Sequence, residues 1–339
     1  MISKKLLIPM RLLADQALLE HLPSGHPARA SIEADLDKRS SGWIGEQNLA
    51  YYLDMFEIAD FHVFYGLHLD DCQIDVLILT PTFISLIEVK NYSGILIFTS
   101  EKGQVIRRMG ERRDGFPNSL LQVGRHRELL LRWLTAHGLP AIPIEADVVI
   151  SNPSTIIENP THSRHVQNHV VHAEQAPLKI QEMLEKHSGG RRYTPFLQQI
   201  ETQLMQAHSD PFANVLNTFA IPPSELLRGV RCARCRNYAM RRIYANWHCP
   251  HCGNKSKTAH ESMILHYFLL MGQTMTNKQC REFLNLGADQ RLIVNRLIKK
   301  MNLTLSGNGR GKGLYYLSPS HEQLSQCLKN TIKSRRKRR

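Results

Sequence analysis

Two acidic residues and a lysine fall on neighbouring apolar segments, where together they could act on a phosphate ester. The segment Gln73–Leu79 carries Asp75, and the next apolar segment, beyond Pro81-Thr82, carries Glu88 and Lys90. If Pro81 and Thr82 are the two turn residues of a hairpin, the antiparallel register places Asp75 opposite Glu88. Lys90 lies two residues beyond Glu88, so strand alternation puts both side chains on one face.

A cation is needed to hold two such carboxylates together. Side by side on a largely apolar hairpin they repel each other, and a hard divalent ion binds carboxylate oxygens well. The sequence therefore predicts Mg²⁺ (or Mn²⁺) at this site, with Lys90 orienting water and offsetting the negative charge that develops on a phosphorane. A strand-end turn residue is the alternative reading of Asp75 alone.

Glu46 is a second acidic anomaly. In the helix predicted from Ser40 it has the same phase as the apolar residues Leu49, Ala50 and Leu53. A carboxylate is thus expected on a buried helix face. Taken alone, Glu46 is equally compatible with a buried salt bridge to Lys90.

These segments resemble a known family. Gly42–Glu46, Gln73–Leu77 and Ile87–Tyr92 are similar to the NERD (nuclease-related domain) family of the PD-(D/E)xK nuclease superfamily, over roughly residues 38 to 155. The resemblance implies metal ligation by Asp75, Glu88 and the backbone carbonyl of Val89, and catalytic roles for Glu46, Asp75, Glu88, Lys90 and Gln122. Superfamily members often carry a cationic or aromatic residue four positions after that glutamine, and here the residue is His126.

Four cysteines form two Cys-x-x-Cys pairs with 13 residues between them: Cys232, Cys235, Cys249 and Cys252. The spacing resembles a zinc ribbon, in which four thiolates close a tetrahedral Zn²⁺ site and leave no position open for catalysis. We therefore expect structural Zn²⁺. A redox pair or an iron–sulfur cluster is the alternative.

The charge is divided unevenly along the chain. Residues 1–224 contain 20 Lys and Arg against 25 Asp and Glu, net −5, whereas residues 225–339 contain 23 against 5, net +18. Such an excess favours a polyanion, because Lys and Arg displace the counterions condensed on phosphate backbones. We expect a nucleic acid, DNA in the first instance, held by the C-terminal third. A merely solubilising basic surface is the alternative.

The apolar pattern after the cysteines predicts three helices, at 261–271, 277–285 and 289–301, and two short strands within 303–317. Thr276 and Gln279 match a capping box at the start of the second helix. This order is typical of a winged helix-turn-helix, a module that also binds proteins, so a protein partner or a homo-oligomer stays open.

The third of these helices has an apolar stripe and a polar face. Leu292, Ile293, Leu297 and Met301 are expected to point inward. Arg291, Asn295 and Lys299 recur every four residues on another face, which could enter a major groove, with Arg310 and Lys312 of the glycine-rich turn on the phosphate backbone. A solvated helix face is the alternative.

The fold class expected is α/β: a restriction-endonuclease-like mixed sheet flanked by helices, then a small zinc ribbon and a winged helix. Strands are predicted at 62–69, 73–80, 83–91, 144–151 and 166–172, and a cationic loop at 107–117 precedes a helix at 118–137. The expected boundaries are an N-terminal extension 1–39, a nuclease-like domain 40–190, a helical linker 191–228, a zinc ribbon 229–256, a winged-helix-like domain 257–320 and a basic tail 321–339.

The sequence as a whole predicts a Mg²⁺-dependent nuclease that hydrolyses phosphodiester bonds in DNA. No apolar run is long enough to cross a bilayer, and the unpaired Cys72, Cys280 and Cys327 favour a reducing cytoplasm over a secreted disulfide scaffold. The alternative is a noncatalytic nucleic-acid-binding regulator or structural partner that retains the nuclease fold. The juxtaposed acids and lysine favour the enzyme.

Overall fold

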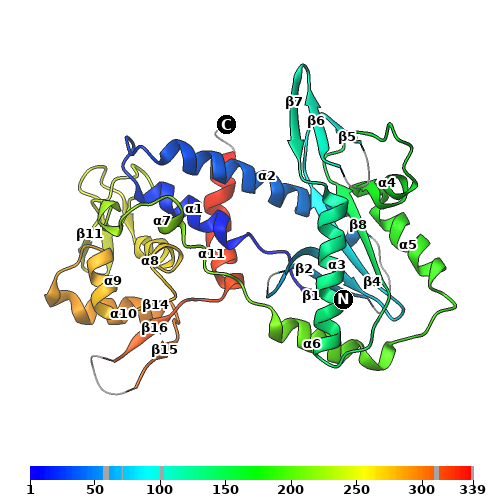
Figure 1. Ribbon diagram of the computed structural model, residues 1–339. Coiled ribbons are helices and arrows are strands. Elements are labelled where there is room, and N and C mark those ends of the chain that lie inside the picture. Colours follow the sequence, from blue (N-terminus) through cyan, green and yellow to red (C-terminus); the bar gives the residue numbers. More distant parts are fainter. Residues whose placement is uncertain (56–60, 71, 100–102, 309–312, 337–339) are drawn as a thin grey trace. The chain divides into compact units, whose positions relative to one another are not determined.

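The computed structural model describes residues 1–55, 61–70, 72–99, 103–308 and 313–336. The chain forms two compact units (Figure 1). The first comprises residues 1–7 and 40–209, and the second comprises residues 8–39 and 210–339. The N-terminal residues 8–39 thus belong to the same unit as the C-terminal part of the chain.

A six-stranded sheet forms the centre of the first unit. Its strand order is β1-β2-β3-β4-β8-β10, with β2, β3 and β4 antiparallel and the remaining neighbours parallel. The bounds are β1 Ile2–Lys4, β2 His62–Leu69, β3 Cys72–Leu79, β4 Ile84–Lys90, β8 Ile144–Ile150 and β10 Val170–His172. The mixed α/β architecture expected from the sequence is confirmed.

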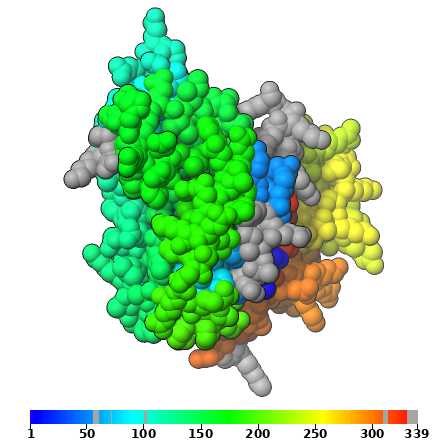
Figure 2. Space-filling view, turned by 90° about the vertical axis from the view of Figure 1, so that its right-hand side faces the viewer, coloured from blue at the N-terminus to red at the C-terminus, as the bar shows by residue number. Residues whose placement is uncertain are grey.

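Helices cover both faces of this sheet, because successive strand residues point to opposite sides. On one face, Leu77 and Leu86 pack with α3 (Ser119–Ala136) and α6 (Leu197–Ala207). On the other face, Val76 and Ile87 pack with α2 (Arg29–Asp54) and α5 (Ala176–Lys186). Figure 2 shows the surface that the α4–α6 segment forms on this unit, in green.

Helix α2 begins at Arg29, so the predicted start at Ser40 is wrong. Pro27 lies in the turn that precedes the helix, and neither Gly nor Pro occurs from residue 28 to residue 41, so nothing in the sequence interrupts an earlier start. The predicted strand at 166–172 is also partly wrong. Ser163 accepts a hydrogen bond from the Val166 N–H and caps the short helix α4 (Arg164–His169), which leaves only β10 as strand.

The predicted cationic loop at 107–117 is a β-hairpin. Strands β6 (Val105–Met109) and β7 (Arg112–Phe116) join at Gly110, whose φ of 60° suits glycine. With β5 (Ile95–Phe98) and β9 (Ile156–Glu158) they form a second sheet of order β7-β6-β5-β9. The hairpin projects as an arm from the unit (Figures 1 and 2). The sequence predicted a loop because four arginines interrupt the apolar pattern of these strands. In the hairpin, Arg107 and Arg112 are both paired with Asp114.

The second unit combines N-terminal and C-terminal helices with two small sheets. Helix α1 (Met10–His21) packs against α7 (Val215–Thr218), α8 (Ala259–Leu270) and α11 (His321–Arg336). One sheet is β11 (Arg241–Ile243), β12 (Asn246–His248) and β13 (Lys255–Ser256). After α8 follow β14 (Thr274–Met275), α9 (Asn277–Phe283), α10 (Arg291–Lys300), β15 (Leu305–Ser306) and β16 (Tyr315–Leu317). Short 3₁₀ turns lie at Ala173–Gln175, Thr194–Phe196, Pro223–Glu225 and Ala288–Gln290.

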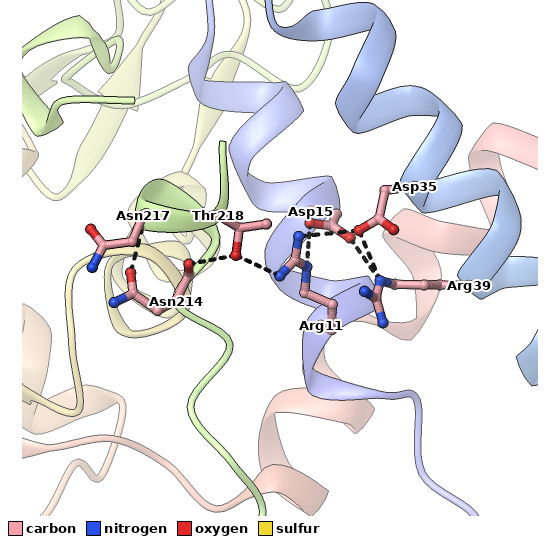
Figure 3. Close-up of polar contacts among 7 residues, drawn as sticks. All are labelled: Arg11, Asp15, Asp35, Arg39, Asn214, Asn217 and Thr218. Carbon is pink, nitrogen blue, oxygen red and sulfur yellow. Dashed lines mark hydrogen bonds and ion pairs between the residues drawn. The ribbon is translucent and has the colours of Figure 1, made fainter. Parts of the chain in front are cut away.

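A network of ion pairs ties the N-terminal helices of this unit together (Figure 3). The carboxylate of Asp15 is fully buried, lies 2.9 Å from Arg11 Nε and 3.6 Å from Arg39 Nε, and has its pKa raised to about 7, chiefly by burial. Arg11 also donates to Thr218 of α7 at 2.9 Å. These contacts join α1, α7 and the first turns of α2, so the N-terminal helices are structural parts of the unit. No helix within the described ranges is long and apolar enough to cross a membrane.

Candidate active site and metal centres

The turn between β3 and β4 brings the two predicted acids together. Thr80 N–H donates to the Phe83 carbonyl at 3.0 Å, so Pro81 and Thr82 are the turn residues. The ladder then runs from Leu79 opposite Ile84 to Val76 opposite Ile87. Its next position places Asp75 beside Glu88, in the register that the sequence predicted.

Lys90 joins Glu88 to helix α3. The Lys90 ammonium donates to Glu88 Oε1 at 2.5 Å and to Gln122 Oε1 at 3.1 Å. One turn further along α3, His126 Nδ1 lies 3.5 Å from the other carboxylate oxygen of Glu88. Burial acts to lower the pKa of Lys90, but the Glu88 carboxylate outweighs it and the net shift is upward, so Lys90 is charged.

Asp75 lies against the backbone of β4. Its Oδ2 accepts a hydrogen bond from the Val89 N–H at 2.9 Å. Burial raises the pKa of Asp75 well above its usual value, and the nearby carboxylates of Glu88 and Glu46 raise it further. The ionised form of Asp75 is therefore costly unless positive charge comes close.

Glu46 approaches the same acids from α2. Burial is the main cause that raises the pKa of Glu46 to about 7; the Lys4 ammonium opposes this shift and the Glu88 carboxylate adds to it. Three acids thus influence one another, while Lys4 opposes the rise in the pKa of Glu46 and Lys90 opposes that of Asp75.

The preceding residue, Gly45, allows the helix to come this close. A Cβ atom at Gly45 would lie 2.6 Å from Ser151 Oγ and 2.8 Å from Asn91 Cβ, at the ends of β8 and β4. Asn91 holds the same helix by donating from Nδ2 to the Ser41 carbonyl at 2.7 Å. These positioning residues were not predicted from the sequence, although a glycine directly before the half-buried glutamate was a visible signal.

The oxygen donors fit a hard cation by their chemistry. Carboxylates are the ligands that Mg²⁺ and Mn²⁺ prefer, and three of them here exceed the compensating positive charge. Within the described part of the chain, however, the carboxylate oxygens of Glu46, Asp75 and Glu88 do not form a group whose members all lie within 4.8 Å of one another. Lys90 and the Val89 N–H hold two of the acids instead.

The four predicted zinc ligands converge in residues 229–258, here called the cysteine module. Their sulfur atoms all lie within 4.8 Å of one another, with Cys232 Sγ 3.6 Å from Cys252 Sγ and Cys235 Sγ 3.5 Å from Cys249 Sγ. This cluster is compatible with a zinc ribbon and could bind Zn²⁺. Burial acts to raise the pKa of Cys232, but backbone N–H groups of Cys235 and Arg234 outweigh it and lower the pKa to about 6, which favours the thiolate.

The two halves of the cluster are built alike. Cys232 N–H donates to Asn237 O and Cys249 N–H to Asn254 O, both at 2.9 Å. The fifth residue of each loop has a positive φ, 63° at Arg236 and 71° at Gly253. Each loop therefore folds its cysteines inward through its own backbone.

The polar face of α10 is exposed as predicted, with Arg291, Asn295 and Lys299 all open to solvent. Asn295 accepts a hydrogen bond from Asn277 of α9 at 2.7 Å. The expected inward position of Leu292 is wrong, since its side chain is 68% exposed and Val294 and Ile298 fill the core instead. Arg310 and Lys312 lie outside the described residues.

The comparison with protein families identifies the part of the chain that carries the acids. Residues 41–151 match the family described as nuclease-related domain, NERD. The matched segment contains Glu46, Asp75, Glu88, Lys90 and Gln122. A NERD domain indicates a nuclease-related function and the use of a divalent metal. Comparison with curated proteins and with solved structures gave no match.

The first prediction concerns the stability that the protein loses when Glu46 ionises. Its pKa in the folded protein is about 7 against an ordinary 4.5, so stability is lost as pH rises through this range, because the unfolded chain releases the proton first. Glu46→Gln should therefore raise the melting temperature more at pH 8.0 than at pH 5.5, in buffer without added Mg²⁺ or chelator. Asp54→Asn, an exposed change on the same helix, should show no such pH dependence. Equal gains at the two pH values would contradict the raised pKa of Glu46.

The second prediction concerns zinc. Purified full-length protein should contain about one zinc per chain by elemental analysis. Cys249→Ser should abolish the zinc and destabilise the second unit, because Cys249 is fully buried beside Trp247. Cys327→Ser, which changes an exposed cysteine, should leave the zinc content intact. A folded protein with no zinc would refute the assignment.

Proposed function

We propose that the chain is a nuclease that hydrolyses phosphodiester bonds in nucleic acid, DNA in the first instance, with Mg²⁺ or Mn²⁺. One observation carries the proposal: Asp75 and Glu88 lie beside Lys90, and Glu46 acts on both acids, within the segment that matches the NERD family. A purely structural domain gains nothing from three mutually repelling carboxylates. Perturbed carboxylates with a lysine are what metal-dependent hydrolysis requires.

In this proposal Asp75, Glu88 and the backbone carbonyl of Val89 would hold the metal. A bound Mg²⁺ would supply Lewis-acid chemistry, which polarises a phosphodiester oxygen and lowers the pKa of nearby water. Lys90, whose positive charge is secured by Glu88, orients the attacking water and offsets the charge that develops on the phosphorus oxygens. Gln122 limits the positions of the Lys90 ammonium through their 3.1 Å hydrogen bond. Glu46, on α2, adds a third negative charge near Asp75 and Glu88.

The second unit is proposed to grip the substrate. It contains 27 Lys and Arg against 11 Asp and Glu, net +16, whereas the first unit has a net charge of −3. We assign the cysteine module as a zinc ribbon and residues 257–320 as a winged helix. The order α8, β14, α9, α10, β15 and β16, with an antiparallel sheet β14-β16-β15, supports the second assignment.

The third prediction tests the chemistry. Asp75→Asn and Lys90→Met in the full-length chain should each slow cleavage of plasmid and single-stranded DNA in Mg²⁺ by at least about 100-fold. Affinity for DNA should change by less than about twofold, because the removed groups serve the reaction rather than the grip. Asp147→Asn is the matched control, since Asp147 is a buried acid on β8 that pairs with His169 at 2.9 Å. It should cut at the wild-type rate.

Circular dichroism must show that each variant is folded. If Asp75→Asn still cut at the wild-type rate in preparations free of other nucleases, the activity would not come from this site. If the wild-type protein bound DNA and never cut it with Mg²⁺ or Mn²⁺, the noncatalytic binding protein would be the better account.

The fourth prediction tests nucleic-acid binding by the second unit. The double variant Arg291→Gln, Lys299→Gln should weaken DNA binding and reduce the slope of log affinity against log salt by about two, one per lost phosphate contact. Arg164→Gln with Lys186→Gln, which removes two charges from the first unit, should leave the slope unchanged. Substitution keeps α8 and α11 packed against α1, whereas a truncation near Pro223 would remove both helices. An unchanged slope in the α10 variant would mean that this face is merely solvated.

A further inference from the structure

The tip of the cysteine module presents an aromatic ring to solvent. Strands β11 and β12 pair Ile243 with Asn246, so Tyr244 and Ala245 form the turn. Tyr244 is 98% exposed, and the neighbouring Ile243 is 44% exposed. Ala245 adopts a positive φ of 53°, which closes this turn tightly. A large ring fully in water at such a position contributes nothing to the core of its own unit.

The sheet behind this tip has one buried and one exposed face. Arg242, Trp247 and Ser256 are paired across the three strands, and Trp247 is fully buried. Residues paired across strands share a face. Arg241, His248 and Lys255 are also paired across the strands and form a row on the opposite face, where Arg241 and Lys255 are exposed.

The charge of the module points to an anion. Residues 229–258 contain seven Lys and Arg and no Asp or Glu. Arg231 is neutralised by Glu20 of α1 at 2.8 Å, and Arg242 lies over the Trp247 ring at 5.5 Å. The exposed row and the exposed ring together define a small platform, which consists of Arg241, His248, Lys255, Ile243 and Tyr244.

We propose that this platform binds an unpaired stretch of single-stranded nucleic acid. The Tyr244 ring stacks on one unpaired base, and Arg241 and Lys255 contact the neighbouring phosphates. A base inside a duplex hides both of its faces in the stack, so a ring on a short turn gains stacking only from a single strand. The assignment deepens the proposed function by naming the form of substrate that the second unit selects.

The experiment measures binding of three fluorescent ligands to the full-length protein by anisotropy, with zinc retained and without added Mg²⁺ so that nothing is cut. The ligands are a single-stranded DNA, the same strand as a duplex, and an abasic strand of equal length. Tyr244→Ala should weaken single-strand binding about tenfold, within the range of one base stacked on one aromatic ring. Affinities for the duplex and the abasic strand should change less than about twofold, and the salt slope should not change.

Two further variants make the result specific. Tyr244→Phe keeps the ring and should bind the single strand within about twofold of wild type. Tyr51→Ala removes a ring that is 62% exposed in the first unit and should have no effect. Zinc content and circular dichroism should match wild type, since Tyr244 is exposed.

The proposal is overturned if Tyr244→Ala leaves single-strand affinity unchanged, or if it weakens all three ligands equally, as expected of a general contact or a protein-binding tip. Its failure is separable from failure of the nuclease. A protein that never cuts can still show the Tyr244 effect, and a protein that cuts through Asp75 can lack it.

Discussion

Repulsion among three carboxylates, one buried and two half-buried, is the constraint around which the first unit is built. Glu46, Asp75 and Glu88 come from α2, β3 and β4, and the pKa values of Glu46 and Asp75 are raised because burial and the neighbouring acids oppose ionisation. Lys90 relieves part of this charge through its 2.5 Å contact with Glu88. Acids that repel one another in this way destabilise the fold unless positive charge comes close.

The surrounding fold exists to hold these groups in place. A two-residue turn sets the register of β3 and β4, and the parallel neighbour β8 fixes β4 along its whole length. Helix α3 supplies Gln122, which contacts Lys90, and His126, which lies beside Glu88. Gly45 allows α2 to pack closely against the ends of β4 and β8, which brings Glu46 toward the other acids. Helices and strands of one unit therefore position every group of this set.

Local chemistry decided how much of this the sequence could predict. The Pro81-Thr82 turn determines which residues face each other, and cysteine spacing alone predicts that the four cysteines converge. Other features depended on tertiary partners. The arginines of β6 and β7 are typical of a loop, but Asp114 pairs with Arg107 and Arg112 in the hairpin. Leu292 has the phase of a core residue, but its side chain is 68% exposed. The start of α2 at Arg29 was missed because good helix formers give no boundary signal.

The most direct test of the central claim is titration of full-length protein with Mn²⁺, followed by electron paramagnetic resonance. We expect one bound Mn²⁺ per chain in wild-type protein and in Asp147→Asn, in addition to the predicted zinc. Glu88→Gln, which neutralises one acid without changing its volume, should lose this Mn²⁺ while remaining folded. Equal Mn²⁺ binding by wild type and Glu88→Gln would contradict the account, because the acids around Lys90 would then not be the metal site.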